Sequence, residues 1–148
     1  MPAISVGLRG LILGLSVLPI IACSPEETGP EAAILANIKA IAQAVENKDT
    51  GEVLDYVTEQ FLGNDRLDKR ELQGLMLAYY LRHKKINVVV TRMDIEVSEY
   101  DPYSAKMRGS VLLTGTDRLL PENGRLINVS GEWQKYGDDW LLARLDWQ

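Results

Sequence analysis

Few side chains that could perform chemistry stand at a recognisable spacing in this sequence. The chain has one cysteine, Cys23, and one histidine, His83. A zinc site needs three or four Cys, His or carboxylate ligands, and an internal disulfide needs a second cysteine. Neither glycine loop that cradles phosphates, GxxxxGKS/T or GxGxxG after a strand, is present. We therefore expect no metal site and no cofactor.

Cys23 directly follows the most hydrophobic stretch of the chain. Residues 1–9 carry one basic side chain, Arg9, and the run from Gly10 to Ala22 carries no charge. A short basic region, an apolar run and a small residue at its end are typical of a secretory signal. The run is shorter than the roughly 20 apolar residues of a membrane-spanning helix. The pattern predicts a signal peptide over residues 1–22.

The residues Ile20-Ile21-Ala22-Cys23 resemble the lipobox of bacterial lipoproteins. The resemblance implies cleavage after Ala22, diacylglycerol on the Cys23 sulfur and acylation of the new amino terminus. Each buried methylene of an acyl chain gains about 0.8 kcal/mol, so two or three chains anchor firmly. Ser24, in place of aspartate, resembles lipoproteins carried to the outer membrane and facing the periplasm. The alternative, an incidental buried cysteine, fits poorly with the charged, proline-containing flank.

The remaining chain is acidic. The sequence has 16 basic and 21 acidic residues, a formal charge of −5, and residues 1–22 contain only one charged side chain, which is basic. Nucleic-acid binding requires clustered Lys and Arg, so no nucleic-acid partner is expected. Residues 23–30 hold the cysteine and a tether with two prolines, a glycine and two glutamates. We expect one domain over residues 31–148.

Three helices are predicted in the first part of this domain. The first covers residues 31–47, where isoleucine and valine recur at spacings of three and four. A short second helix is expected over residues 51–58. The third begins after Asp68, where Glu71 completes the pattern of a capping box, and ends near His83.

After Lys85 the pattern changes to alternating, β-branched residues, which is typical of strands. Four antiparallel strands are expected, over residues 86–100, 105–114, 125–136 and 140–147. Alternation in the first predicts one shared face of Val89, Thr91, Met93, Ile95 and Val97. A loop of residues 137–139 in the last hairpin would place Glu132 opposite Arg144 and Tyr136 opposite Trp140.

Helices followed by antiparallel strands predict an α+β fold. Three segments resemble the nuclear transport factor 2-like family: "AIAQAVENKDTGEVLDYVTEQF" (40–61), "AYYLRHKKINV" (78–88) and "GEWQKYGDDWLLARLDW" (131–147). The resemblance implies a cone in which three N-terminal helices pack on a curved, mainly antiparallel four-stranded sheet. It also implies a cavity between sheet and helices, and a dimer through the sheet. Family members include isomerases, dehydratases, hydrolases and non-catalytic binding modules, so the fold alone names no activity.

Large apolar residues and one ion pair are the candidates for lining such a cavity. They are Phe61, Met76, Tyr79, Tyr80, Met107, Trp133, Glu132 and Arg144. The apolar members could instead only fill the core. A buried Glu132–Arg144 pair would anchor an anionic or hydroxylated ligand, whereas on the surface such a pair contributes about 0–1 kcal/mol. His83 is expected to be a helix-end cation rather than a general base.

No catalytic set of residues can be assembled from the sequence. We therefore expect a membrane-anchored periplasmic lipoprotein whose domain binds a small apolar ligand or an envelope protein without catalysis. The alternative is a cavity enzyme of the isomerase, dehydratase or hydrolase type that uses carboxylate or tyrosine acid–base chemistry. A pocket with Asp or Glu beside Tyr or His would favour the enzyme, and a closed apolar core or an exposed apolar patch would favour the binding module.

Replacing Cys23 with serine tests the predicted anchor. The hydroxyl cannot replace the thiol as acceptor of diacylglycerol, so the variant should appear as a soluble protein or as an unprocessed precursor. Fractionation of the bacterial host and the intact mass of the chain measure both outcomes. Unchanged membrane association together with normal maturation would show that the lipoprotein prediction is wrong.

Overall fold

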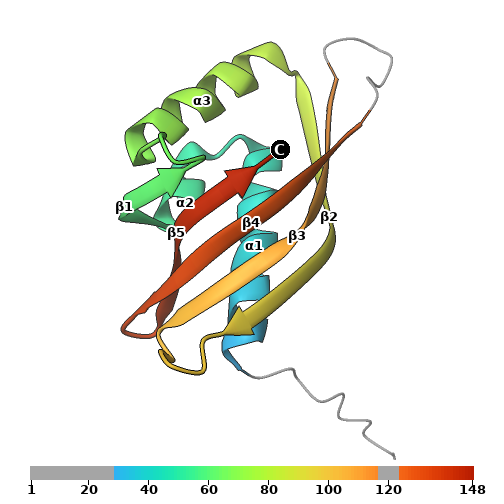
Figure 1. Ribbon diagram of the computed structural model, residues 1–148. Helices are drawn as coiled ribbons and strands as arrows, with labels where there is room; N and C mark the ends of the chain where they lie inside the picture. Colours follow the sequence, from blue (N-terminus) through green and yellow to red (C-terminus); the bar gives the residue numbers. More distant parts are fainter. Residues whose placement is uncertain (1–28, 117–123) are drawn as a thin grey trace, which may run out of the picture.

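The computed structural model describes residues 29–116 and 124–148, which form three helices and five strands (Figure 1). The helices are α1 (Pro30–Asn47), α2 (Thr50–Asp55) and α3 (Lys69–Arg82). The strands are β1 (Val57–Gly63), β2 (Lys85–Val97), β3 (Ser104–Thr116), β4 (Arg125–Tyr136) and β5 (Asp139–Trp147). The predicted α+β class, the three helices and the four C-terminal strands are confirmed.

The sheet has five strands rather than the predicted four, in the order β1-β5-β4-β3-β2. β1 runs parallel to β5, and the other neighbours are antiparallel. The second helix was expected to reach position 58, but α2 ends at Asp55, and Val57 and Thr58 belong to β1. Two consecutive exposed polar residues, Glu59 and Gln60, break the alternation of this strand. For that reason the hydrophobic pattern did not reveal β1.

The segment between α1 and α2 also holds α3 in place. Lys48 ends α1 in the left-handed conformation, with φ of 59°, and the Asp49 side chain caps α2 by accepting the N–H of Glu52. Lys48 Nζ donates to the carbonyl oxygens of Tyr80 and His83 at the end of α3. The last carbonyls of a helix lack partners within the helix, so one lysine links the C-terminal ends of two helices.

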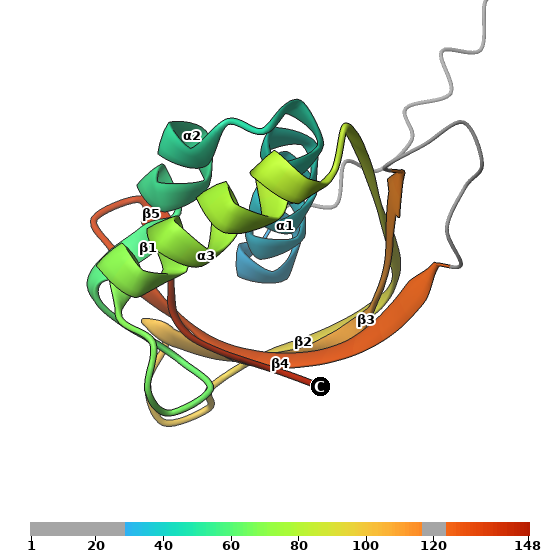
Figure 2. The same cartoon turned by 90° about the horizontal axis from the view of Figure 1, so that it is seen from above.

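The sheet is curved, and the helices lie on its concave side (Figure 2). α1 packs mainly against β2, and α3 packs mainly against β1 and α2. The buried core joins α1 to the sheet, with Trp133 and Ile34 fully enclosed. Within residues 29–116 and 124–148, the core residues lie between positions 34 and 145.

Two β-bulges interrupt the pairing of the curved sheet. Thr91 is the extra residue in β2, and Ala143 is the extra residue in β5. A bulge bends its strand and increases the local twist. Because side chains alternate between the two faces, one extra residue also reverses which of the following side chains face inward.

The bulge in β2 corrects the predicted inner face of that strand. Val90, before the bulge, and Met93, after it, both pack against the core. Val89, which was expected on the same face as Met93, is 52% exposed, and Thr91 is also exposed. The prediction was wrong for Val89 and Thr91 because an alternating pattern gives no sign of an extra residue.

The last hairpin has a two-residue turn, 137–138, instead of the three-residue loop. The predicted pairing of Tyr136 with Trp140 is therefore wrong, and the register near the turn differs by one residue. The bulge in β5 compensates for the shorter turn, so Glu132 does lie opposite Arg144 as predicted.

A glycine on the neighbouring strand accompanies each bulge. A Cβ on Gly109 would overlap the carbonyl oxygen of Arg92, next to the bulge in β2. A Cβ on Gly131 would lie 2.7 Å from the carbonyl oxygen of Arg144, next to the bulge in β5. Glycine at both positions permits the close approach of two backbones that the bulges require.

We predict that Gly109→Ala and Gly131→Ala each lower the free energy of unfolding by about 1–3 kcal/mol, because packed neighbours must move. Urea denaturation measures this change. Gly74→Ala is the matched control: a Cβ there has no atom within 4 Å, and the variant should gain about 0.5–1 kcal/mol in helix propensity. If all three variants had the same stability, the bulges would not depend on glycine.

Candidate ligand-binding cavity

A cavity of about 250 Å³ lies between α1 and the concave side of the sheet. Sixteen residues from α1 and four strands line it: Ile38, Ile41, Ala42, Val45, Val88, Val90, Met93, Met107, Val111, Leu113, Ile127, Val129, Trp133, Leu142, Leu145 and Trp147. None of these side chains is ionisable. Figure 2 shows the inner curve of the sheet, which supplies the strand residues of this lining.

The strands supply most of this lining through their alternating side chains. Val90, Val111 and Ile127 lie directly opposite one another on β2, β3 and β4. Branched aliphatic side chains at facing positions of neighbouring strands give a continuous apolar surface. The bend of the sheet holds this surface away from α1, and that separation leaves the cavity.

Trp133 and Met107 are buried members of the cavity lining. Trp133 is fully buried, and its indole Nε1 donates to the sulfur of Met107 at 3.2 Å. This contact gives the one polar atom of the Trp133 side chain a partner inside the protein. The ring is therefore available to a ligand as an apolar wall.

The sixteen described lining side chains offer a ligand hydrophobic contact. General acid–base or nucleophilic catalysis requires an ionisable or nucleophilic group within reach of the substrate, and none of the sixteen lining side chains provides one. Burial of apolar surface is worth about 25 cal/mol per Å². At 250 Å³ the volume is just below the range of about 300–1,000 Å³ for typical ligand sites, which favours a small ligand.

Of the candidate pocket residues, Met107 and Trp133 lie in the cavity lining. Phe61 is 2% exposed and belongs to the core around β1. Met76 and Tyr80 are on α3, which contributes no residue to the lining.

The aromatic residues of α3 pack outside the cavity. The rings of Tyr79 and His83 have centroids 4.2 Å apart. Burial raises the pKa of Tyr80, and the negative charge of Asp49 raises it further. Tyr80 therefore stays a neutral phenol at ordinary pH, and its carbonyl oxygen accepts from Lys48 in the segment between α1 and α2.

Glu132 and Arg144 lie on the convex side of the sheet, opposite the cavity. Arg144 Nε donates to Asp146 at 3.0 Å, and the guanidinium also pairs with Asp65 from the loop after β1. The hydrogen bonds to Asp146 and Asp65 raise the pKa of Arg144. The side chains of Arg144 and Asp146 are about one-third exposed, so this cluster joins the β1–α3 loop to β5 but forms no closed binding site.

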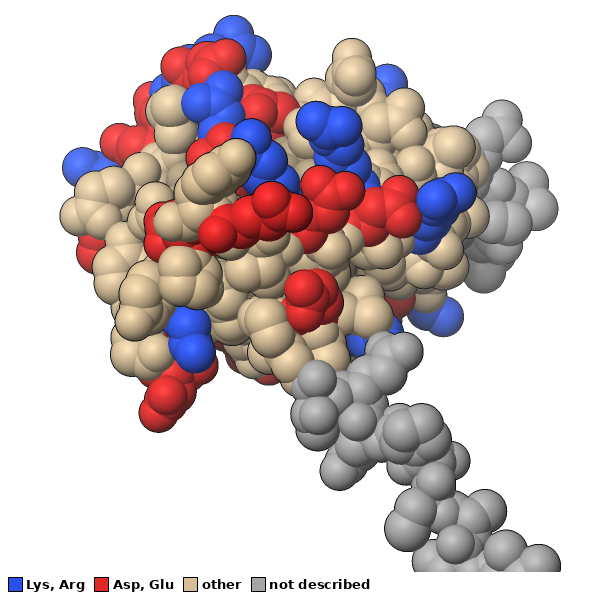
Figure 3. All heavy atoms as spheres, turned by 60° about the horizontal axis from the view of Figure 1, so that its bottom comes forward, with Lys and Arg blue, Asp and Glu red and all other residues tan. Residues whose placement is uncertain are grey.

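Charges alternate across the convex side. Glu96, Lys106, Glu132 and Arg144 occupy facing positions on β2, β3, β4 and β5. Acidic and basic atoms accordingly lie side by side on the surface seen in Figure 3. Exposed pairs of this kind contribute little to stability, but they keep this side of the sheet hydrated.

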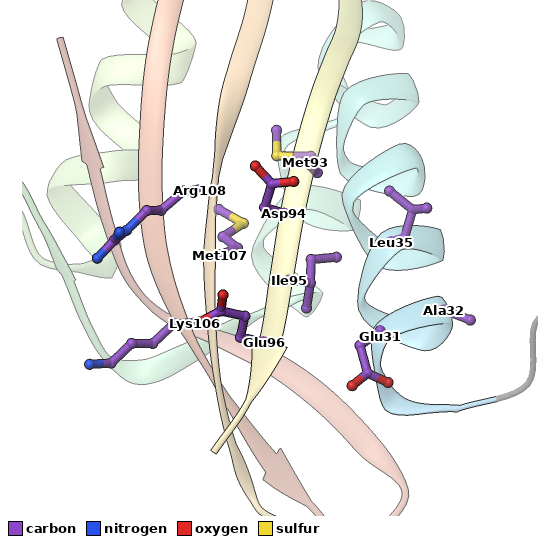
Figure 4. Close-up of a pocket in the computed structure, with 10 residues that line it drawn as sticks. All are labelled: Glu31, Ala32, Leu35, Met93, Asp94, Ile95, Glu96, Lys106, Met107 and Arg108. Atoms are coloured by element: carbon purple, nitrogen blue, oxygen red, sulfur yellow. The ribbon is translucent and has the colours of Figure 1, made fainter. Parts of the chain in front are cut away.

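A second hollow, of about 540 Å³, lies around the β2 edge of the sheet. In Figure 4, Ile95 points toward α1, whereas Lys106 and Arg108 point away from it. The hollow thus includes groups from both faces of β2, and its charged members are exposed. Within residues 29–116 and 124–148, no group of three or more His, Cys, Asp or Glu residues could hold a metal ion.

Most of the cavity-lining residues were not among the predicted pocket residues. Alternation within β3 and β4 places Val111, Leu113, Ile127 and Val129 on one side, so these residues could have been found from the pattern. The two bulges hid the inward positions of Val88 and Val90 in β2 and of Leu142 in β5, because these residues lie before the bulge in their strand.

No known family model and no curated protein matches the chain. Solved structures match its fold. A nuclear transport factor 2-like protein of unknown function from Pseudomonas putida has a TM-score of 0.67 at 11% identity, covering 80% of this chain and 84% of that one. A protein provisionally named a dehydratase of the same fold family, from Streptomyces avermitilis, has a TM-score of 0.66 at 11% identity and coverages of 78% and 91%.

A larger protein from Bdellovibrio bacteriovorus also contains the fold, with a TM-score of 0.66 at 13% identity. The match covers 78% of this chain but only 40% of that one. At these identities the likeness concerns the fold alone. The described part of the chain therefore has the nuclear transport factor 2-like fold.

Proposed function

We propose that the domain binds a small apolar molecule or the end of an acyl chain in its concave cavity and does not transform it. The observation that supports this function is the complete absence of ionisable side chains among the sixteen lining residues. Hydrophobic attraction has no direction, so selectivity would come from the size and shape of the cavity. A dehydratase or hydrolase of this fold would need an acid or base in the cavity, which this lining does not offer.

We also propose that the domain is held at a membrane by lipid on Cys23, at the periplasmic side of the outer membrane. The support is the Ile20 to Cys23 pattern and the apolar run before it. Ala22 and Cys23 lie outside the described residues. Among the helices of residues 29–116 and 124–148, none has the length and hydrophobicity to cross a bilayer.

The dimer through the sheet remains a proposal. The row of Glu96, Lys106, Glu132 and Arg144 would be complementary to itself if a second copy were turned about an axis parallel to the strands. Glu96 would then face Arg144 of the other copy, which is the self-complementary arrangement of a two-fold interface. An envelope protein that binds this charged surface is the other partner we consider.

A variant that fills the cavity tests the proposed function. Ala42 lines the cavity, and Ala42→Phe should weaken binding of N-phenyl-1-naphthylamine about tenfold or more because the added ring takes the place of the probe. Ala36→Phe, on the exposed side of the same helix, is the matched control and should leave affinity unchanged. Probe fluorescence measures affinity in the domain of residues 24–148, and thermal unfolding checks that each variant is folded. Equal affinity of all three proteins would refute binding in this cavity.

Arg144→Gln tests whether the convex ion pairs take part in binding. Because Arg144 lies on the side of the sheet opposite the cavity, probe affinity should stay unchanged in the same titration. A large loss of affinity in a folded Arg144→Gln variant would place the ligand on the convex side instead.

A further inference from the structure

Three leucines of α3 are exposed, and two of them, Leu77 and Leu81, share its outer side. Leu75, Leu77 and Leu81 are 47%, 48% and 89% exposed. Gly74, three residues before Leu77, and Ala78, three residues before Leu81, are exposed as well. Large apolar side chains gathered on a surface mark a site of interaction more often than isolated ones do.

The same helix already uses its inner side for packing. Tyr80 is the buried residue of α3, and Leu72 packs against the core. Leu77 and Leu81 lie one turn apart on a different side, which they share with Arg70 in the first turn. α3 is therefore apolar on two sides, and only one of them is covered by the rest of the domain.

Positive charge surrounds the exposed leucines. Residues 66–85 hold six basic and two acidic side chains, whereas the whole chain has a formal charge of −5. Five of these cations are exposed and make no ion pair with another described residue: Arg66, Arg70, Arg82, Lys84 and Lys85. Lys69, by contrast, is paired with Glu59 at 2.7 Å. The cations stand at both ends of the leucine side of the helix.

We propose that α3 binds the surface of a lipid bilayer that contains anionic headgroups. Leu77 and Leu81 enter the boundary between headgroups and acyl chains, as the apolar side of an interfacial helix does. Arg70 at one end and the basic residues at the other end contact the headgroup phosphates, because long cationic side chains extend toward the polar layer. This interaction is separate from ligand binding in the cavity.

The shape of this surface favours a bilayer over a folded protein partner. No α3 residue lines the cavity or the hollow around β2, and Figures 1 and 2 show α3 on the outside of the domain. Protein interfaces concentrate their binding energy where side chains fill pockets on the facing surface. α3 has 14 residues and is about 21 Å long. A protruding helix of this kind needs no preformed pocket in a bilayer, because lipid molecules move to accommodate it.

The proposed lipid on Cys23 does not by itself bring α3 to a membrane. In Figure 1, α3 lies at the end of the domain away from Pro30, where α1 begins. The seven residues from Cys23 to Gly29 can span at most about 25 Å, and α1 is about 27 Å long. A tethered domain must rotate toward the membrane to place α3 on the same bilayer. The lipid anchor and the contact of α3 with the bilayer can therefore be tested separately.

Vesicle binding by the untethered domain tests this proposal. The domain of residues 24–148 should sediment with vesicles of phosphatidylcholine containing about 30% phosphatidylglycerol and much less with pure phosphatidylcholine. Leu77→Ser with Leu81→Ser should weaken binding about tenfold or more, because the inserted apolar surface is lost. Val89→Ser with Leu126→Ser, which removes two exposed apolar side chains from the convex side, should leave binding unchanged.

A second pair of variants separates local charge from net charge. Replacing Arg82, Lys84 and Lys85 with glutamine should weaken binding about a hundredfold at low salt, since each basic residue near the bilayer contributes about fivefold. Replacing Arg92, Lys106 and Arg108 with glutamine removes the same charge from the convex side and should have little effect. Thermal unfolding verifies that all variants are folded.

Three results would overturn the proposal. The first is a wild-type domain that does not bind the anionic vesicles. The second is equal loss of binding in the α3 variants and in their controls. The third is a concentration-dependent dimer, seen by analytical ultracentrifugation, that disappears in the Leu77→Ser, Leu81→Ser variant without any vesicle binding, because α3 would then be covered by a second copy of the chain.

Discussion

The close approach of backbones beside two bulges is the constraint on which the rest of this structure depends. At Gly109 and at Gly131, a neighbouring strand comes so near that no other side chain fits without movement. The bulges at Thr91 and Ala143 bend and twist β2 and β5 at these places. A flat sheet would lie against α1 over its whole length, whereas the bent sheet leaves a space between them.

The same bulges divide the side chains between the two faces of the sheet. Without the extra residue in β5, Arg144 would share the face of Leu142 and its charge would be directed into the core. With it, Leu142 and Leu145 face the cavity and Arg144 reaches Asp146 and Asp65 on the convex side. The cost of burying a charge without a partner is high, so the position of the bulge decides whether the cavity can be apolar.

α1 and α3 have different structural roles beside this sheet. α1 closes the cavity, and Lys48 at its end holds the last carbonyls of α3. α3 is thereby fixed at the edge of the domain without covering the strands that form the cavity. Its outer leucines are left in solvent, where they gain nothing for stability. A ligand in the cavity and a bilayer at α3 would use different apolar surfaces of one small domain.

The predicted lipid anchor and the apolar cavity would both handle hydrophobic groups, but by different means. A thioether at Cys23 would hold acyl chains covalently, and the cavity would hold its ligand only through contact with aliphatic and aromatic walls. Under these proposals the charged convex side would take no part in either role. Its alternating charges keep that surface wet and leave it available for a dimer or for an envelope protein.

Much of the fold could be predicted from short-range patterns in the sequence. Three such patterns depend on neighbours only a few positions away, so their elements could be predicted: the stripe of apolar residues in α1, the capping box at Asp68 and the alternation in β3 and β4.

The lining of the cavity could not be predicted in the same way. β1 depends on pairing with β5, far away in the chain, and the extra residues Thr91 and Ala143 look like ordinary strand positions. Only the assembled sheet decides where a strand must bend, because the bend results from contact between backbones that are distant in sequence. One residue added at such a place reverses every following side chain, and for that reason tertiary structure, not the alternation of residues, decided which groups face the cavity.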